Sequence, residues 1–256
     1  MDATATSLAL QEQVTFAFEE HVAWHTVGIV CDDGKAIGTG VAVSFAGRNL
    51  VITAAHVVQE TRPDRISFMF RPPGTLVRAP LPEAASRRHQ VAVTPRIEAR
   101  IADVIADRTL DIALLAVSWE LSRERRVRFF ELRPDALAPV AGTIVLSKGY
   151  PTDCALPMGG QDKLLLSVAN SGYIAENPKL GSLDGFDPQQ SFVVPYHLAK
   201  IAHARGFSGA PAWFQKPTPG IWRPNPGLAG ICTNYYRHSG LLSFVRAEKI
   251  IGFLQS

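Results

Sequence analysis

A serine in a glycine-rich turn is the residue of this chain best suited to act as a nucleophile. Ser208 lies in residues 206–211, whose sequence is GFSGAP, so that glycines bracket its hydroxyl and a proline ends the turn. A serine hydroxyl is a weak nucleophile unless a base and a third group that orients the base are also supplied. The chain contains His56 within TAAHVV and Asp111 within TLDIALL, and the three residues follow the order His, Asp, Ser.

These three residue types together predict acyl-transfer chemistry. Neutral His56 would accept the proton of Ser208 and later deliver it to the leaving amine. Asp111 would bind the other ring nitrogen, which fixes the tautomer of the imidazole and stabilises the imidazolium. Each residue taken singly also has a structural interpretation, at a strand end or in a turn. Their order and their contexts favour the catalytic interpretation.

A different hydrolase fold, the α/β-hydrolase, does not fit this sequence. That fold places its serine in G-x-S-x-G, and the acid and the histidine follow the serine in the chain. Ala210 stands where the second glycine belongs, and no Asp or Glu lies between Ser208 and the only later histidine, His238. The expected strands also do not alternate with helices.

The three segments resemble those of the trypsin-like (chymotrypsin-fold) serine peptidases, and they resemble bacterial members more than animal digestive ones. Residues 38–43 (GTGVAV) and 228–231 (LAGI) add to the likeness, which therefore spans most of the chain. The resemblance implies an all-β fold of two six-stranded antiparallel Greek-key barrels, with the active site in the cleft between them and short helices at both ends.

The resemblance also implies a function and a set of site residues. His56, Asp111 and Ser208 would form the catalytic triad of a serine endopeptidase, which hydrolyses peptide bonds through an acyl-enzyme intermediate. The backbone N–H groups of Gly206 and Ser208 would form the oxyanion hole. The mechanism needs no metal and no organic cofactor. The alternative is a catalytically silent module of the same fold that binds a protein partner.

Substrate selectivity follows from the walls of the primary pocket that the resemblance implies. No acidic residue lies near position 202, where cleavage after Lys or Arg would require one, so the sequence predicts a preference for an uncharged, apolar residue before the scissile bond. A pocket lined by Arg205 and His203 would instead favour acidic side chains. The expected substrate-binding residues are Ala202, His203, Thr233, Asn234, Tyr235 and Gly240.

Phe207 departs from the pattern of the zymogen-activated relatives. Those relatives carry an aspartate at this place, which pairs with an N-terminus freed by cleavage. Phe207 cannot form that pair. We therefore expect no activation by N-terminal cleavage, and some other contact must order the turn.

Composition and charge fit an ordinary globular protein. Of the 256 residues, 46% are hydrophobic and 19% are charged, and the formal net charge is only +3. This mild charge does not indicate a nucleic-acid partner, and a solvated surface is the preferred interpretation of the arginines at 123–128. The expected partners are a peptide or protein substrate and, as an open alternative, a dedicated protein partner or activator.

The cysteines and the N-terminus favour a cytoplasmic protein. Cys31, Cys154 and Cys232 are odd in number and have no CxxC spacing, which argues against a disulfide framework or a zinc site and favours free, buried thiols. Val57 stands where secreted relatives usually carry a cysteine. Residues 1–24 lack the basic start of a secretory signal, and no run is long enough to span a membrane.

The elements expected to position these residues are mostly short strands separated by Gly- and Pro-rich turns. Residues 46–49 predict a hairpin turn between strands at 41–45 and 50–53, and residues 71–90 predict an exposed loop. The expected organisation is an N-terminal helical segment (1–24, with a helix over 7–22 capped by Ser7), a first barrel with His56 and Asp111 (25–122), a crossover linker (123–140), a second barrel with Ser208 (141–246) and a C-terminal helix (247–256).

Overall fold

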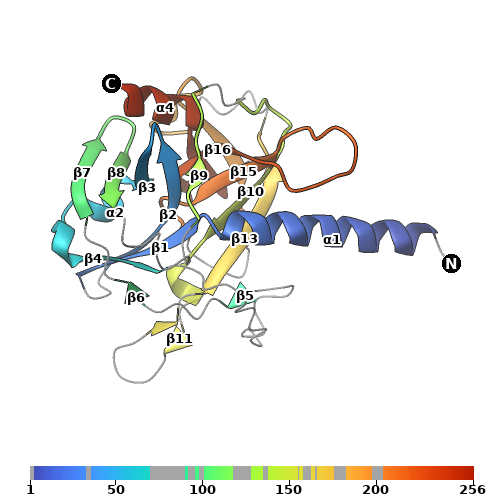
Figure 1. The fold of residues 1–256 in the computed structure, drawn as a ribbon, viewed down its shortest axis with the longest axis horizontal. Helices are drawn as coiled ribbons and strands as arrows, with labels where there is room; N and C mark the ends of the chain where they lie inside the picture. The colour runs from blue at the N-terminus through green and yellow to red at the C-terminus, as the bar shows by residue number, and fades with distance from the viewer. Residues whose placement is uncertain are drawn as a thin grey trace.

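Two antiparallel sheets, one from each half of the chain, make up most of the molecule (Figure 1). The computed structural model describes residues 3–32, 36–69, 90–91, 96–97, 101–117, 128–134, 138–154, 156–157, 163–164, 166–175, 183–197 and 204–256. The fold is the expected one, mostly β with two curled six-stranded antiparallel half-barrels.

The first sheet has the strand order β6-β4-β1-β2-β3-β8-β7. Two-residue strands supplement the six longer ones, since β6 pairs with β4, and β9 pairs in parallel with β2. The strands are β1 (Thr26–Cys31), β2 (Ala36–Phe45), β3 (Arg48–Ala54), β4 (Ile66–Met69), β6 (Arg96–Ile97), β7 (Ile101–Asp107), β8 (Ile112–Val117) and β9 (Phe130–Glu131).

The second sheet has the strand order β14-β17-β16-β15-β10-β13-β5. Its six longer strands all come from the second half of the chain, and a separate two-stranded ladder joins β11 to β12. The strands are β5 (Gln90–Val91), β10 (Ile144–Gly149), β11 (Leu156–Pro157), β12 (Lys163–Leu164), β13 (Leu166–Tyr173), β14 (Ser191–Pro195), β15 (Pro211–Gln215), β16 (Pro226–Tyr236) and β17 (Leu241–Arg246).

The hairpin between β2 and β3 shows how local sequence sets the register. Ala46 and Gly47 both have positive φ, 48° and 77°, which is the two-residue turn whose twist matches that of paired strands. The turn fixes the pairing from Phe45↔Arg48 to Val41↔Ile52. The hairpin expected at 46–49 is therefore confirmed, and it aims the end of β3 at the cleft.

Several strands differ from the expectation, among them β5, β7, β9 and β11. The sequence predicts a strand over 97–101, whereas the strand β7 runs from Ile101 to Asp107. β7 lies at the edge of the sheet and its side chains are mostly exposed, so its hydrophobic pattern is weak. β9 lies inside the expected crossover linker. β5 belongs by position to the expected first barrel but pairs with β13 of the second sheet. The remainder of the expected loop, 71–89, lies outside the described residues.

A hydrophobic core joins the two sheets. It contains Val41 and Ile52 from the first sheet with Leu146, Trp213 and Leu228 from the second, all buried. The terminal helices pack against this same core through Phe18 and Val22 of α1 (Ala3–Ala23) and through three residues of α4 (Ala247–Gln255), namely Ala247, Ile250 and Ile251.

The helix α1 extends well beyond the sheets (Figure 1). It begins at Ala3, so Ser7 lies within the helix and does not cap it. Glu19 on α1 forms an ion pair with Lys148 on β10 at 3.0 Å, and the lysine side chain is almost fully buried. Among the described helices, none is both long and apolar enough to cross a membrane.

Candidate functional site

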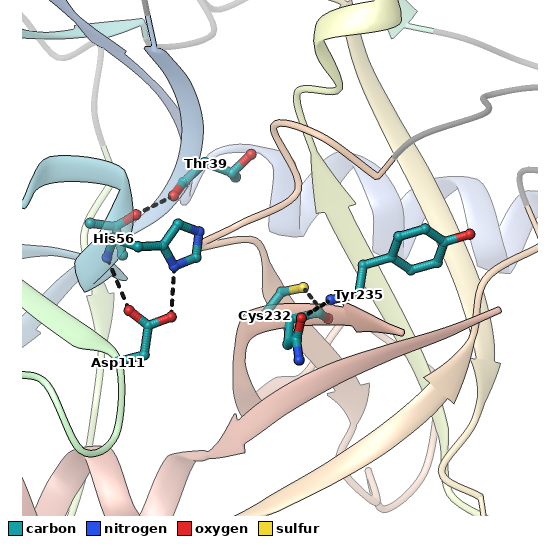
Figure 2. Close-up of polar contacts among 7 residues, drawn as sticks. Thr39, His56, Asp111, Cys232 and Tyr235 are labelled. Atoms are coloured by element: carbon teal, nitrogen blue, oxygen red, sulfur yellow. Dashed lines mark hydrogen bonds and ion pairs between the residues drawn. The ribbon is translucent and has the colours of Figure 1, made fainter. Parts of the chain in front are cut away.

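His56 and Asp111 are joined by two hydrogen bonds (Figure 2). The ring Nδ1 of His56 lies 2.6 Å from Asp111 Oδ2, so this nitrogen carries the proton and donates it to the carboxylate. The backbone N–H of His56 donates to the other oxygen, Oδ1, at 3.0 Å. The remaining ring nitrogen, Nε2, is therefore left as the basic one.

The segments on either side fix this pair in place. Asp111 ends the turn before β8 with a φ of 55°, a left-handed conformation that is uncommon outside glycine. Its carbonyl oxygen accepts the N–H of Ala55 at 2.9 Å, beside His56 on the short helix α2 (Ala55–Val58). Val57 and Val58 are buried, whereas the His56 side chain is 45% exposed. Strained backbone held by three contacts is typical of a functional position.

Ser208 lies in a turn, residues 206–211, that requires its two glycines. Gly206 and Gly209 have φ of 93° and 86°. A Cβ atom at Gly206 would lie 2.2 Å from the carbonyl oxygen of Tyr150, and one at Gly209 would lie 1.8 Å from that of Thr39. Side chains are thus excluded on both sides of the serine by backbone angle and by space.

The backbone N–H groups of this turn fall into two sets. Those of Phe207, Gly209 and Ala210 donate to the carbonyl oxygens of Ala204, Cys232 and Phe207, at 2.7–2.9 Å. Those of Gly206 and Ser208 donate to no acceptor in the part of the chain that the structure describes. Gly206 is buried and Ser208 is half-buried, and an N–H that is shielded from water without an acceptor is costly, so the two groups are available to an external acceptor.

Ser208 lines the same cleft as His56 and Asp111. Within the described ranges, its hydroxyl makes no hydrogen bond, to His56 or to any other residue. Catalytic hydrogen bonds are often long without substrate and tighten in the complex, so this geometry does not remove Ser208 as a nucleophile.

The cleft has a volume of about 590 Å³ and is lined by residues from both sheets. Thr233, Asn234 and Tyr235, which the sequence predicts to bind substrate, line it. Gly240, also predicted to bind substrate, does not line the cleft. It lies in the turn that follows the end of β16 at Tyr236, and the Gly240 carbonyl accepts the N–H of Tyr196. Ala202 and His203 lie outside the described residues.

Other residues reach the cleft that the sequence did not single out. Asp187, Gln190 and Ser191 come from the turn before β14 and from its start. Arg205, which the sequence indicates as an alternative pocket residue, is exposed and also lines the cleft, so the cleft carries both signs of charge. No local motif marks the turn before β14. The turn reaches the cleft through the pairing of β14 with β17, which joins segments distant in sequence.

The nearby thiol is not a competing nucleophile. Burial raises the pKa of Cys232 to about 12, so it stays protonated at neutral pH. Cys31 and Cys232 are both free and buried, as expected. Within the described ranges, no group of three or more His, Cys, Asp or Glu side chains is arranged to hold a metal.

Comparison with known proteins identifies a family and a fold. The family model described as the trypsin-like peptidase domain matches residues 38–216. No curated protein gives a significant match to the sequence.

Among solved structures, two inactivated protease paralogues of the scabies mite are similar. S-I1 is 17% identical with a TM-score of 0.61, over 91% of this chain and 93% of that one. S-D1 is 15% identical with a TM-score of 0.60, over 91% of each. The serine endoprotease from Yersinia pestis is 13% identical with a TM-score of 0.57, over 93% of this chain and 64% of that one. At such identities the likeness shows the fold alone.

Proposed function

Since the chain belongs to the trypsin-like peptidase family, we propose that it is an active serine endopeptidase with the triad His56, Asp111 and Ser208. The observation that carries this proposal is the combination of parts in one cleft. An imidazole held by a carboxylate and a serine line one cleft, and two N–H groups of the serine turn have no acceptor among the described residues; these are the kinds of group that acyl transfer uses.

The proposed reaction begins when Ser208 Oγ attacks the carbonyl carbon of the scissile peptide. His56 Nε2 takes the hydroxyl proton, and the carbonyl electron pair moves onto oxygen, where the N–H groups of Gly206 and Ser208 stabilise it. The C–N bond then breaks as His56 returns the proton to the leaving amine. Water, deprotonated by His56, hydrolyses the resulting ester of Ser208 and completes the cycle.

The edge of β16 supports the binding of an extended peptide. β16 pairs with β15 only as far as Ile231, whereas its pairing with β17 continues to Tyr236. In the described part of the chain, residues 233–236 therefore have no strand partner on the β15 side, and the Tyr235 N–H there donates to the side-chain oxygen Asn234 Oδ1 at 2.8 Å. A substrate that adds a strand to this edge would bring its scissile bond to the cleft.

The side-chain preference proposed for the substrate is an uncharged, apolar residue before the scissile bond. Profiling of cleavage sites in a peptide library tests it directly. A profile led by Lys and Arg would contradict the proposal, and one led by Asp and Glu would favour a pocket in which Arg205 selects the substrate.

The function is tested by labelling with a fluorophosphonate probe, which reacts only with an activated serine. We expect the native protein to label, and Ser208→Ala and His56→Ala to lose labelling. Asp111→Asn should slow it by about 10⁴-fold, because the wrong imidazole tautomer would be favoured. Exposed residues of the same types provide the controls, Ser171→Ala and His238→Ala, which should label like the native protein.

The alternative function is a silent module of this fold that binds a protein partner. The observation that favours it is the Ser208 hydroxyl, which has no hydrogen bond to His56 within the described residues. The scabies mite paralogues show that the fold exists in inactivated proteases. Absence of labelling in a folded native protein, alone and in host lysate, would support this alternative.

A further inference from the structure

We propose that Thr39 is a positioning residue that holds the serine turn in the conformation a substrate requires. It would replace the ion pair that an N-terminus freed by cleavage forms in the zymogen-activated relatives. The inference rests on the proposed function, because a turn held ready matters only if Ser208 reacts. It also explains how a chain with Phe207 at the usual aspartate position orders its oxyanion hole.

Thr39 contacts the turn on both sides of Phe207. Its hydroxyl donates to the carbonyl oxygen of Gly206 at 2.6 Å, and its backbone N–H donates to the carbonyl oxygen of Ser208 at 2.8 Å. Both carbonyls are thereby directed toward β2 of the first sheet. Because a trans peptide sets its C=O and N–H on opposite sides, these contacts fix the peptide units 206–207 and 208–209, which flank on both sides the unit that carries the Ser208 N–H.

The same hydroxyl also anchors to the second sheet. Thr39 Oγ1 accepts the backbone N–H of Tyr150 at 3.0 Å, just beyond β10. The Thr39 carbonyl accepts the hydroxyl of Thr53 at 2.6 Å, and Thr53 lies on β3 three residues before His56 (Figure 2). One threonine thus connects the strand that leads to the base with the turn that carries the nucleophile.

The peptide between Arg205 and Gly206 is held from the other side. The Arg205 carbonyl accepts the N–H of Thr152 at 2.9 Å. Its trans partner, the N–H of Gly206, therefore points away from Thr152, and it has no acceptor among the described residues. A flip of this peptide would bury the Arg205 carbonyl in the oxyanion hole, and it would first have to break this contact.

Burial makes these contacts hard to replace by water. Thr39, Thr53 and Phe207 are each fully buried. The Phe207 ring packs edge-on against Tyr196 and lies over Gly149, where a Cβ would lie 3.1 Å from the ring. Phe207 fills its site with an apolar ring and supplies no charge, so the polar contacts that orient the turn come from its neighbours.

The test replaces the hydroxyl and keeps the shape. Thr39→Val removes both side-chain hydrogen bonds, whereas Thr39→Ser keeps them. Thr26→Val is the matched control, because Thr26 is a buried threonine whose hydroxyl donates to the Val22 carbonyl, outside the cleft. Near-UV circular dichroism checks the folding of each variant.

We expect Thr39→Val to lower kcat by about 10²-fold with KM changed less than about 3-fold, as loss of oxyanion stabilisation does. Thr39→Ser should recover kcat to within about 5-fold of the native value, and Thr26→Val should keep it. Native kcat in folded Thr39→Val, or an equal loss in Thr26→Val, would overturn the proposal.

A second readout does not depend on activity. Hydrogen exchange followed on the peptide that covers residues 204–210 should be roughly 10-fold faster in Thr39→Val than in the native protein and unchanged in Thr26→Val. If the native protein fails to label with fluorophosphonate, the proposed function fails, and this exchange still tests the role of Thr39. Unchanged exchange in folded Thr39→Val would contradict that role.

Should Thr39→Val not fold, Thr53→Val carries the test. It removes only the hydrogen bond from the Thr53 hydroxyl to the Thr39 carbonyl. A folded Thr53→Val protein should lose about 10-fold in kcat, with faster exchange in the same peptide. A native kcat together with a native rate of hydrogen exchange in folded Thr53→Val would overturn the proposal.

Discussion

Single residues hold the parts of the site in place through contacts made by backbone as much as by side chain. Asp111 binds the His56 segment with its carbonyl and with both carboxylate oxygens. Thr39 binds the serine turn with its N–H and its hydroxyl. A substitution that preserves side-chain chemistry but shifts either backbone would therefore disturb the cleft.

A buried histidine near the junction of the sheets makes stability depend on pH. Burial lowers the pKa of His25 to about 4, and the carbonyl of Arg128, which accepts from His25 Nδ1 at 2.7 Å, opposes this only in part. His21 and the Arg128 charge lower it further. The unfolded chain, with a pKa near 6.5, binds the proton first as pH falls.

We therefore predict that His25 lowers the free energy of unfolding as pH falls from about 6.5 to about 4, by about 3 kcal/mol in all. His25→Asn keeps a donor for the Arg128 carbonyl and cannot titrate. Urea unfolding measures the free energy of unfolding at pH 7 and at pH 4. Its decrease between these two pH values should be smaller in His25→Asn than in the native protein, by about 3 kcal/mol. The exposed His238→Asn should behave like the native protein, and equal drops in all three would refute the prediction.

At the scale of elements, an ion pair docks α1 on the second sheet. Lys148 on β10 and Glu19 on α1 are 1% and 14% exposed. Removing the charge of one partner leaves the other charge buried without this ion pair, which is more costly than removing both charges.

Glu19→Gln should lower the free energy of unfolding by about 3–5 kcal/mol, and the double variant Glu19→Gln, Lys148→Met should recover much of it. Glu131→Gln is the control, because its pair with Arg133 is exposed and should contribute less than about 1 kcal/mol. Chemical denaturation of the four proteins measures these values. A loss in the double variant as large as in Glu19→Gln would show that the pair is not the cause.

How far the sequence predicts the molecule depends on how local each feature is. The turn at Ala46 and Gly47 is set by neighbouring residues, and the GFSGAP turn carries a local glycine pattern, so both could be recognised without the structure. The pairing of β5 with β13 and the contact of Lys148 with Glu19 join residues distant in sequence, and no periodicity reports them. Thr39 belongs to a recognised motif, but its role depends on contacts with residues more than 100 positions away.

At the scale of the whole molecule, one core serves both sheets. Buried residues of the first sheet, such as Val41 and Ile52, pack in the same cluster as Leu146 and Trp213 of the second. A core shared in this way couples the unfolding of the two halves.

We predict that urea abolishes fluorophosphonate labelling and far-UV circular dichroism over the same concentration range. Each half contributes part of the site, so labelling needs both, and the shared core makes them unfold together. Two separated transitions in circular dichroism, or loss of labelling well before loss of secondary structure, would contradict this.

The division of the site between the two sheets also bears on how the chain is made. His56 and Ser208 are about 150 residues apart, so at about 5–20 residues per second their synthesis is separated by roughly 8–30 s. During that interval the growing chain carries the base and its carboxylate partner but no nucleophile. A chain that ends before Ser208 therefore lacks the nucleophile, and hydrolysis by the proposed triad requires that residues of both halves have been made.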